Sequence, residues 1–519
     1  MPQLFGDAAL DSLLAVLALA GMLAWLNRRR RASRGGAKPV EIAECLPLGA
    51  RRLVLLRAAE GERLLLLGRD DVVVESRIAP EPERAPEPEP APPEPRPPSE
   101  LVGLFWIGVL SLVAGTAIGV LCGAFRLALT LADDYRGRIA ETMQDRPVLG
   151  CAVMTLGAAA ATWLAAYLVR RIVPSAVGSG IPHVESVLHR EEPPASPILL
   201  PVKFIGGVLA IGAGLALGRE GPSVQMGATL AHQIARLFRR EWRDAEALLA
   251  SGAGAGLAAA FNAPLAGSAF ALEELLRRFD MRHATVALGA SAGAISVMRL
   301  MLGPTPELRV APHFAVDALD IPASLAIGAA AGLVSLAYNR AILGALDLAD
   351  DLPWTIERKA AVVGAGIGAL AFFAPGVVGG GEILTQRTLD GEFTLAALPV
   401  IFALRFLLGV VSYAAGTPGG LFAPLLTLGA EIGFFLGLVL HGAEALDKGM
   451  AYAIVGMAAY FAAVVRAPLT GMILITEMTN SSELLLPMLA ACFAAMATAA
   501  ACRNEPIYDS LKARAARIA

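Results

Sequence analysis

The chain carries one set of motifs twice, in the same order and 201 to 204 residues apart. The copies pair 177–180 with 378–381, 218–222 with 420–424, 263–267 with 467–471, and Glu273 with Glu477. Glycine and proline interrupt apolar sequence at matching places in both halves. Two homologous halves broken in this way are typical of a membrane transporter whose binding site lies between its repeats.

The composition indicates a membrane protein. Of the 519 residues, 56% are hydrophobic and 17% are charged, whereas about a quarter of the residues in a soluble domain are charged. Apolar stretches occupy 103–121, 147–169, 321–338, 359–374, 393–412 and 450–464. Several are shorter than the roughly 20 residues that a full span needs, which favours broken or re-entrant helices. The sequence therefore predicts an all-α polytopic membrane protein.

Several other functions are disfavoured. The net charge of −3 argues against a nucleic-acid partner. The five cysteines have no metal-ligand or redox spacing, and the six histidines form no helix-face pair of the kind that holds a metal. We expect no metal site, no cofactor and no enzymatic activity.

The first 100 residues differ in character from the rest. An apolar segment, 8–26, is followed by Arg28–Arg31 and Arg34, which predicts a membrane anchor over 1–34 with its N-terminus outside. Four short apolar runs predict a small β-rich cytoplasmic module over 35–78, with strands at 40–45, 52–57, 63–67 and 72–74. A Pro/Glu-rich linker follows over 79–100, and the transport body over 101–512 has repeats at about 101–300 and 320–512, before a tail at 513–519.

Gly178–Pro182 can end one helix and begin another. A helix N-terminus presents unpaired N–H groups and partial positive charge, so an anion is a natural occupant inside a membrane. The Ser179 hydroxyl could donate one further hydrogen bond. The alternative is a glycine-rich packing or kink motif.

Glu220 lies within the most informative loop, Gly218–Pro222. Carboxylates at membrane depth are rare and mark functional sites. Glu220 could occupy the place of an anion over a helix N-terminus and leave it on protonation, which would couple proton binding to anion binding. The alternative is a structural pair with Arg219. In the second copy, Gly420–Pro424, an apolar Phe422 replaces the carboxylate, and a packing role for its glycines is the alternative.

Two further sites each have two interpretations, and two more have one each. Glu273 and Glu274 end an apolar run before Arg277 and Arg278, so they could relay protons at the cytoplasmic edge or simply pair with those arginines. Lys203 could raise the positive potential along an anion path or extend to the interface. Glu477, the repeat partner of Glu273, predicts a structural acceptor for a nearby helix start, and Tyr508 by itself predicts an interfacial aromatic residue.

These motifs resemble the CLC family of chloride channels and proton-coupled chloride exchangers, over about 101–512. Asn262–Gly267 with Glu273-Glu274, and Arg466–Gly471 with Glu477-Met478-Thr479, add to the three loops. The resemblance implies a homodimer of subunits with two inverted-topology repeats, in a bacterial inner membrane. The implied selectivity filter consists of Gly178, Ser179, Gly180, Ile181, Pro182, Gly218, Arg219, Glu220, Gly221, Pro222, Gly420, Leu421, Phe422, Ala423 and Pro424.

The resemblance also implies roles for single residues. Ser179 and Tyr508 would contact the anion with hydroxyls, and Ile181, Leu421 and Phe422 with backbone N–H groups. Glu220 matches the gating glutamate, and Glu274 matches the internal proton-transfer glutamate of the exchangers. Two departures are His183, where related bacterial sequences often carry an acid, and Glu505, where they often carry Lys.

Three functions follow as hypotheses. The first is secondary active exchange of chloride for protons, and the second is a passive, voltage- or pH-gated chloride channel, which Glu274 disfavours. The third is a scaffolding role, because the anchor, its basic flank and the segment 46–68 resemble the FliO family of flagellar export-apparatus accessory proteins. That module could contact other membrane or cytoplasmic proteins, although an arbitrary small module is an equal alternative.

Overall fold

The computed structural model describes residues 41–48, 51–58, 61–67, 72–74, 98–310 and 320–518. These residues belong to two compact units, a small sheet and a helical body, and each is described here by itself. The predicted anchor over 1–34 and most of the predicted linker lie outside the described residues. Both stay predictions, as does the resemblance to the FliO family.

The small unit is a four-stranded antiparallel sheet in the order β1-β2-β3-β4. Its strands are β1 (Glu41–Leu48), β2 (Arg51–Ala58), β3 (Gly61–Leu67) and β4 (Val72–Val74). Each strand overlaps one of the four predicted ranges, and each pairs with its neighbour in sequence. A register shift between Ile42 and Glu44 marks a bulge in β1. Its position in the cytoplasm stays a prediction.

Two series of helices with the same element order form the helical body. The first comprises α2 (Pro98–Thr142), α3 (Pro147–Ile172), η1 (Pro174–Ala176), α4 (Ile181–Leu188), α5 (Leu199–Gly212), α6 (Glu220–Leu237), α7 (Trp242–Phe261), α8 (Pro264–Phe270), η2 (Ala271–Leu275) and α9 (Met281–Leu302). The second comprises α10 (Asp320–Asp351), α11 (Ile356–Phe373), η3 (Pro375–Val377), α12 (Glu382–Leu389), α13 (Leu398–Ala414), α14 (Phe422–His441), α15 (Leu446–Val465), α16 (Pro468–Thr479), η4 (Ser482–Leu484) and α17 (Leu485–Ala501). A final helix, α18 (Ile507–Ile518), follows.

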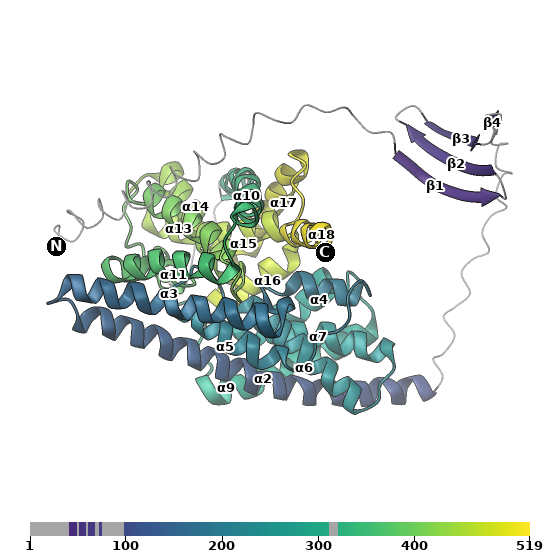
Figure 1. Cartoon of the computed structure of the whole chain (residues 1–519). Helices are drawn as coiled ribbons and strands as arrows, with labels where there is room; N and C mark the ends of the chain where they lie inside the picture. The colour runs from purple at the N-terminus through teal and green to yellow at the C-terminus, as the bar shows by residue number, and fades with distance from the viewer. Residues whose placement is uncertain are drawn as a thin grey trace. The chain divides into compact units, whose positions relative to one another are not determined.

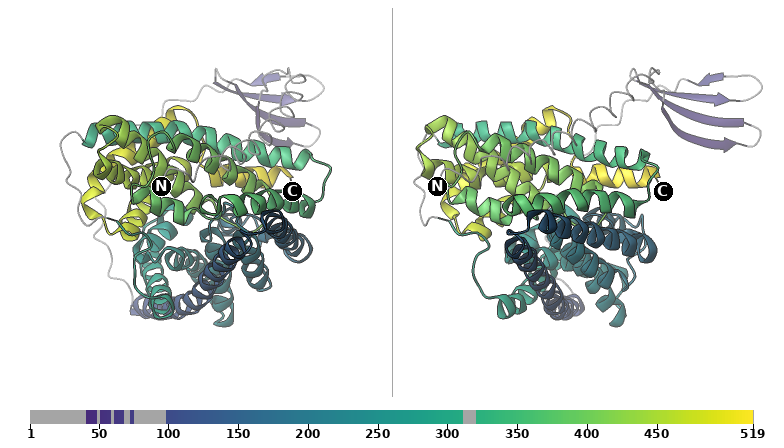
Figure 2. Two further views of the ribbon diagram at one scale, coloured as in Figure 1. Left: turned by 90° about the vertical axis from the view of Figure 1, so that its left-hand side faces the viewer. Right: turned by 60° about the vertical axis from the view of Figure 1, so that its left-hand side comes forward.

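The packing repeats as well as the order. The α2–α9 contact of the first half corresponds to α10–α17 in the second, and α6–α7 corresponds to α14–α15. Two corresponding pairs meet each other across the halves, α3 against α11 and α8 against α16. The first half, coloured blue to teal, and the second, coloured green to yellow, form two layers (Figure 1) that stay distinct when the molecule is turned (Figure 2). The two-repeat fold predicted from the motifs is therefore confirmed.

The helices divide into core and peripheral elements. Among the described residues, seven helices are long and apolar enough to cross a membrane. Of the apolar window of α15, 89% is buried inside the protein, but only 28% of that of α3. An apolar helix with an exposed apolar surface is suited to lipid, whereas α15 is a core helix of the body.

Glycines let the paired core helices approach closely. A Cβ atom at Gly227 on α6 would clash with the backbone of Gly252 on α7. The matching contact in the second half joins Gly429 on α14 to Gly456 on α15. Because small residues at helix contacts allow backbones to approach, Gly227 and its repeat counterpart Gly429 are explained by packing.

Two boundaries differ from the predicted ones. Helix α2 begins at Pro98, inside the predicted linker, because proline is compatible with a first helical turn. Residues 513–518, predicted as a tail, continue α18, where Arg514 forms an ion pair with Asp347 at 3.2 Å.

Candidate ion-binding site

The three glycine-rich loops converge on one another. Gly178 and Thr417 to Gly419 are joined by two backbone hydrogen bonds, from Gly178 N to Thr417 O at 3.1 Å and from Gly419 N to Gly178 O at 3.0 Å. Gly218 and Gly420 exchange a reciprocal pair at 2.8 and 2.7 Å. The loops that the sequence places about 200 residues apart therefore form one continuous structure.

Each loop ends where a helix begins. α4 begins at Ile181, α6 at Glu220 and α14 at Phe422, as the motifs predict. Pro182, Pro222 and Pro424 all lie in the first turn, where a missing N–H is tolerated. Gly180, before α4, has a φ of 83°, and Gly381, before α12, has a φ of 102°, a backbone conformation that side chains rarely adopt.

The start of α6 lies between the other two loops. A Cβ atom at Gly221 would lie 2.6 Å from the Ser179 hydroxyl, and one at Gly420 would lie 2.8 Å from the nitrogen of Gly221. Only glycine fits at these positions without displacing a neighbouring loop. Backbone N–H groups of several helix starts therefore face a common region, which is the arrangement that binds an anion without a cationic side chain.

Glu220 is completely buried, and neither of its carboxylate oxygens has a hydrogen-bond partner among the described residues. Its carboxylate lies against Gly218, and so does the backbone nitrogen of Ala423, in the first turn of α14. A negative charge over a helix N-terminus is favourable. The unpaired carboxylate therefore occupies a position that suits an anion.

Arg219 does not pair with its neighbour Glu220. Its guanidinium contacts Glu307, Glu382 and the carbonyl oxygen of Ala260 instead, at 2.8 Å for Glu382 and 3.0 Å for Ala260. The structural alternative for Glu220 is therefore wrong. Neither Glu307 nor Glu382 was singled out from the sequence, because nothing in the spacing links them to Arg219.

Two hydroxyl groups face the same region from other elements. Ser179 is 1% exposed and Tyr508 is 0% exposed, and neither hydroxyl oxygen has a hydrogen-bond partner among the residues described. Buried hydroxyls are usually hydrogen-bonded, so an unpaired couple indicates a ligand position. The burial of Tyr508 contradicts its interpretation as an interfacial aromatic residue.

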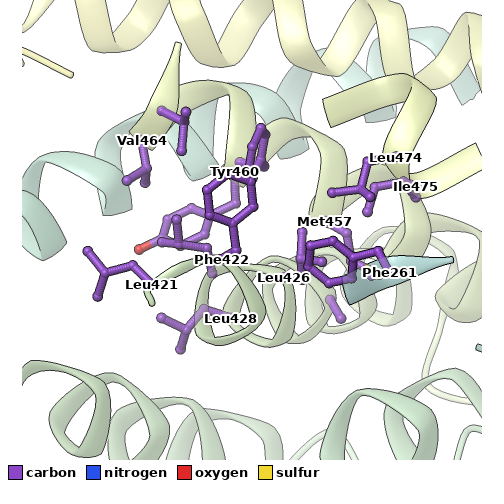
Figure 3. Close-up of a cluster of buried hydrophobic side chains, with 14 of the residues drawn as sticks. Phe261, Leu421, Phe422, Leu426, Leu428, Met457, Tyr460, Val464, Leu474 and Ile475 are labelled. Atoms are coloured by element: carbon purple, nitrogen blue, oxygen red, sulfur yellow. The ribbon is translucent and has the colours of Figure 1, made fainter. Parts of the chain in front are cut away.

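Phe422 closes the region with its ring. The ring stacks on Tyr508 at 6.1 Å between centroids and packs against Phe461 at 4.8 Å. Its buried surroundings include Leu421, Leu428 and Tyr460 (Figure 3). An apolar ring at this point narrows a path while the N–H groups of the same helix start stay directed toward it.

A buried cation secures each repeat's own loop. Lys203 is completely buried and donates to the carbonyl oxygens of Ala176 and Gly178 at 3.0 and 2.7 Å. In the second half, Arg405 donates to the carbonyl oxygens of Val377 and Gly379, both at 2.9 Å. Lys203 therefore does not extend to an interface. Arg405 is its structural counterpart in the second half. It was not predicted from the sequence, although it lies 202 residues after Lys203, at the repeat spacing.

Glu274 lies in a π-helical turn, η2, that continues α8. Such turns insert one extra residue and often occur at functional sites. Glu274 is 5% exposed, and Glu185 of α4, which is 2% exposed, faces it. Glu185 was also missed, because a lone acid on a short helix carries no distinctive spacing. Arg277 and Arg278, the suggested partners of the acid pair, bind Asp509 and Glu246 instead.

The two remaining motif glutamates cap helices reciprocally. Glu273 accepts hydrogen bonds from the backbone N–H groups of Leu469 and Thr470 at 3.0 and 2.7 Å, at the start of α16. Glu477 accepts them from Leu265 and Ala266 at 3.1 and 2.8 Å, at the start of α8. The structural role predicted for Glu477 is confirmed, and Glu273 shares it, which leaves Glu274 alone as the candidate proton carrier of that pair.

His183, the first departure from the family pattern, lies on the first turn of α4. Its Nδ1 atom is 3.3 Å from Nε2 of Gln225, and its Nε2 atom is 3.6 Å from the Glu192 carboxylate. Gln225 in turn packs against the Gly180 turn. The Gln225 side chain therefore links the His183 ring to the Gly180 turn of the first loop.

The matching sequence family is described as "Voltage gated chloride channel", and its profile matches residues 157–500. Among curated proteins, the chain is 36% identical over 418 residues to a protein named H(+)/Cl(-) exchange transporter ClcA from Salmonella arizonae. That alignment covers 78% of this chain and 88% of the relative. A protein of the same name from Citrobacter koseri is 36% identical over 415 residues, with coverages of 78% and 87%.

Solved structures show the same fold. The chain resembles "a slow cyanobacterial Cl-/H+ antiporter" with a TM-score of 0.76 and 31% sequence identity, covering 79% of this chain and 97% of that one. It also resembles a eukaryotic CLC transporter with a TM-score of 0.68, but at 23% identity, so that likeness concerns the fold alone. The alignments with these relatives cover 78 to 80% of this chain.

Proposed function

The chain belongs to the CLC family of voltage gated chloride channels, and on that premise we propose that it is a secondary active transporter that exchanges chloride for protons. The protein would hold a chloride ion between the three helix starts, with hydroxyls from Ser179 and Tyr508 and backbone N–H groups from Ile181, Leu421 and Phe422. The Glu220 carboxylate would alternate with the anion for the same position.

The main support is the state of the Glu220 side chain. It is buried, ionisable and free of a hydrogen-bond partner among the described residues, beside the start of α14. An isolated charge of this kind is costly unless it is neutralised or stabilised by nearby dipoles. Protonation would remove the charge of the carboxylate and with it the attraction to the helix start. An incoming anion would then take the same dipoles, so one proton would be bound for each release of the gate.

The proton needs a second carrier on the inner side. Glu274 is a buried carboxylate on the π-helical turn, and Glu185 faces it. Two facing carboxylates in a buried region favour the protonated form of one of them. Glu274 would collect the proton from the cytoplasmic side and pass it toward Glu220, past Tyr508.

A passive, voltage- or pH-gated chloride channel is the second candidate. It needs the same helix starts but has no use for a buried internal carboxylate. The three relatives at more than 30% identity reported above are called exchangers or antiporters, which favours exchange. The proposal requires neither a cofactor nor a metal and assigns no enzymatic step.

The test is a flux assay in liposomes that contain the purified protein. A chloride gradient should drive protons uphill, and the reversal potential should depend on the chloride and pH gradients together. Glu220→Ala should abolish the uphill proton movement, and Glu274→Ala should strongly reduce it. Chloride flux without any proton movement in the unmutated protein would show a channel instead.

The remaining expectations extend the proposal. We infer a homodimer with one anion path in each subunit, located in a bacterial inner membrane. Deletion of residues 1–97 should leave chloride and proton flux unchanged if the front module is an accessory that contacts other proteins. Loss of flux from a folded, membrane-inserted truncation would assign the module a part in transport.

A further inference from the structure

Arg219 directly precedes the gate residue in sequence, and it forms an ion-pair network with three other residues. Arg219 contacts Glu307 and Glu382, and Glu307 contacts Arg126 at 2.6 Å. The four come from separate elements: α2, the residue before α6, the segment after α9, and the first residue of α12. We define Arg126, Arg219, Glu307 and Glu382 as the gate network.

The donors of Arg219 are directed away from Glu220. Its Nε atom donates to the carbonyl oxygen of Ala260 at 3.0 Å, one terminal nitrogen bonds Glu307, and the other contacts Glu382 at 2.8 Å. Arginine is the cation best suited to several bonds in a fixed plane, and here all three nitrogens are engaged. The neighbouring Glu220 carboxylate receives none of them.

The position of Glu307 is itself fixed. Next to it, Leu308 N donates to the carbonyl oxygen of Met478 at 3.2 Å, and Arg309 N donates to the side chain of Gln386 on α12 at 2.9 Å. Glu307 is only 6% exposed, whereas the Glu382 side chain is 44% exposed. The network thus has one buried carboxylate and one that solvent reaches.

A pocket borders the network on the side of α14. Its lining includes Glu307, Glu382, Thr385 and Ala423. Ala423 follows Phe422 in the first turn of α14, and its nitrogen and the Glu220 carboxylate both lie against Gly218. Within the network, Arg219 and Glu382 are the charged groups that act on Glu220.

We propose that Glu307 and Glu382 are positioning residues that hold the Arg219 guanidinium away from Glu220, so that the gating carboxylate stays unpaired and free to take up a proton. An unrestrained guanidinium one residue away would form a strong charge-assisted pair with the carboxylate. Such a pair would keep Glu220 ionised and in place. The proposal rests on the gating function proposed above. It explains why Arg219 and Glu220, which carry opposite charges at adjacent positions, do not form an ion pair that holds the gate in place.

The charges near Glu220 and Glu382 determine in which direction removal of the Glu382 charge shifts the protonation of Glu220. Arg219 and Glu382 face Glu220, and Glu382 is faced by Arg219, Glu307, Arg126 and Asp133. Removal of the Glu382 charge leaves Arg219 less compensated, which stabilises the ionised form of Glu220. More acid is then needed to protonate the gate. At a separation of several ångströms, one such charge is worth a shift of about one pH unit.

The experiment compares chloride flux against pH in liposomes for the full chain and its variants. Glu382→Gln should move the pH of half-maximal flux about one unit toward acid. Glu382→Asp keeps the charge and should restore the original profile. Glu392→Gln is the matched control, because Glu392 also pairs with an arginine, Arg387, and has a similarly exposed side chain, but lies outside the network; it should leave the profile unchanged.

A combination with the gate mutation decides the route of the effect. In a Glu220→Gln background no gate carboxylate remains to be ionised, so adding Glu382→Gln should cause no further change in the pH profile. An unshifted profile in Glu382→Gln, or a shift that persists in the Glu220→Gln background, would overturn the proposal. Coupled proton movement in the unmutated protein is measured separately, so failure of the network leaves the exchange function itself standing.

Discussion

The two repeats share a scaffold but differ in the chemistry at its centre. Both present a glycine loop, a helix start and a buried cation that binds carbonyl oxygens, Lys203 in the first half and Arg405 in the second. At the first residue of the matching helices α6 and α14, the first half carries Glu220 and the second carries Phe422. On the proposed function, the duplicated helix starts would supply backbone N–H groups to the anion, whereas the carboxylate present in one half alone would make transport respond to protons.

The same division holds on the inner side. Glu273 and Glu477 are duplicated and both cap helices, but the residue that follows each is Glu274 in one half and Met478 in the other. The unduplicated acids, Glu220 and Glu274, therefore lie in the first repeat. Four predictions test this division, from the largest expected effect to the smallest.

Replacement of the gate should have the largest effect. We expect Glu220→Gln to reduce chloride-driven proton movement about 100-fold or more while chloride flux persists, because the amide cannot carry a proton between the two sides. The matched change in the other repeat, Phe422→Leu, should retain coupling. Liposome proton and chloride fluxes measured together check both, and equal loss of coupling in the two variants would contradict the division.

Replacement of the inner acid should have a smaller effect. Glu274→Gln should reduce coupled proton movement about tenfold, because Glu185 and nearby water retain part of the route to the cytoplasm. Chloride flux should stay close to that of the unmutated protein. Met478→Leu serves as the control at the corresponding position of the second repeat. Retained coupling in Glu274→Gln would remove this residue from the proton path.

The buried cations should matter for stability in both repeats alike. Lys203→Met and Arg405→Met each leave two carbonyl oxygens of a central loop without a donor, which should cost about 2–4 kcal/mol of the free energy of unfolding. Thermal unfolding in detergent, followed by intrinsic fluorescence, measures the loss. A large difference between the two variants would show that the repeats are not mechanically equivalent here.

The reciprocal caps should give the smallest change. Glu273→Gln and Glu477→Gln keep one acceptor oxygen each but lose the charge over a helix start, so each should lower stability by about 1 kcal/mol. Both carboxylates accept two backbone bonds, but Glu273 also accepts one from the Thr470 hydroxyl at 2.7 Å, so its variant should lose slightly more stability. Melting temperatures of the two variants, and of the double variant, provide the check, and a loss confined to one variant would break the symmetry.

The sequence predicted the fold well because duplication and helix punctuation are local signals. The breaks at Gly178–Pro182, Gly218–Pro222 and Gly420–Pro424 fall where helices begin, since glycine and proline act on their own backbone. The structural role of Glu477 was also predicted, whereas the matching cap formed by Glu273 was not.

Long-range pairing was not predictable from a single sequence. A pair between Arg219 and Glu220 was the alternative interpretation of that loop, but residues about 90 and 160 positions further on take the donors of Arg219. Glu185 meets Glu274 only because α4 and the π-helical turn η2 pack together. Periodicity shows which face of a helix is apolar, but it does not identify the partner that a buried acid will meet.

The reciprocal caps have a consequence for biosynthesis. Glu477, which caps the start of α8, is synthesised about 210 residues after that helix start. The first turn of α16, which Glu273 caps, is synthesised about 200 residues after Glu273. During that interval the leading half has an uncapped helix and an unsatisfied acid. Synthesis of the second half supplies both missing partners. The two halves therefore complete their folding together, as one cooperative unit.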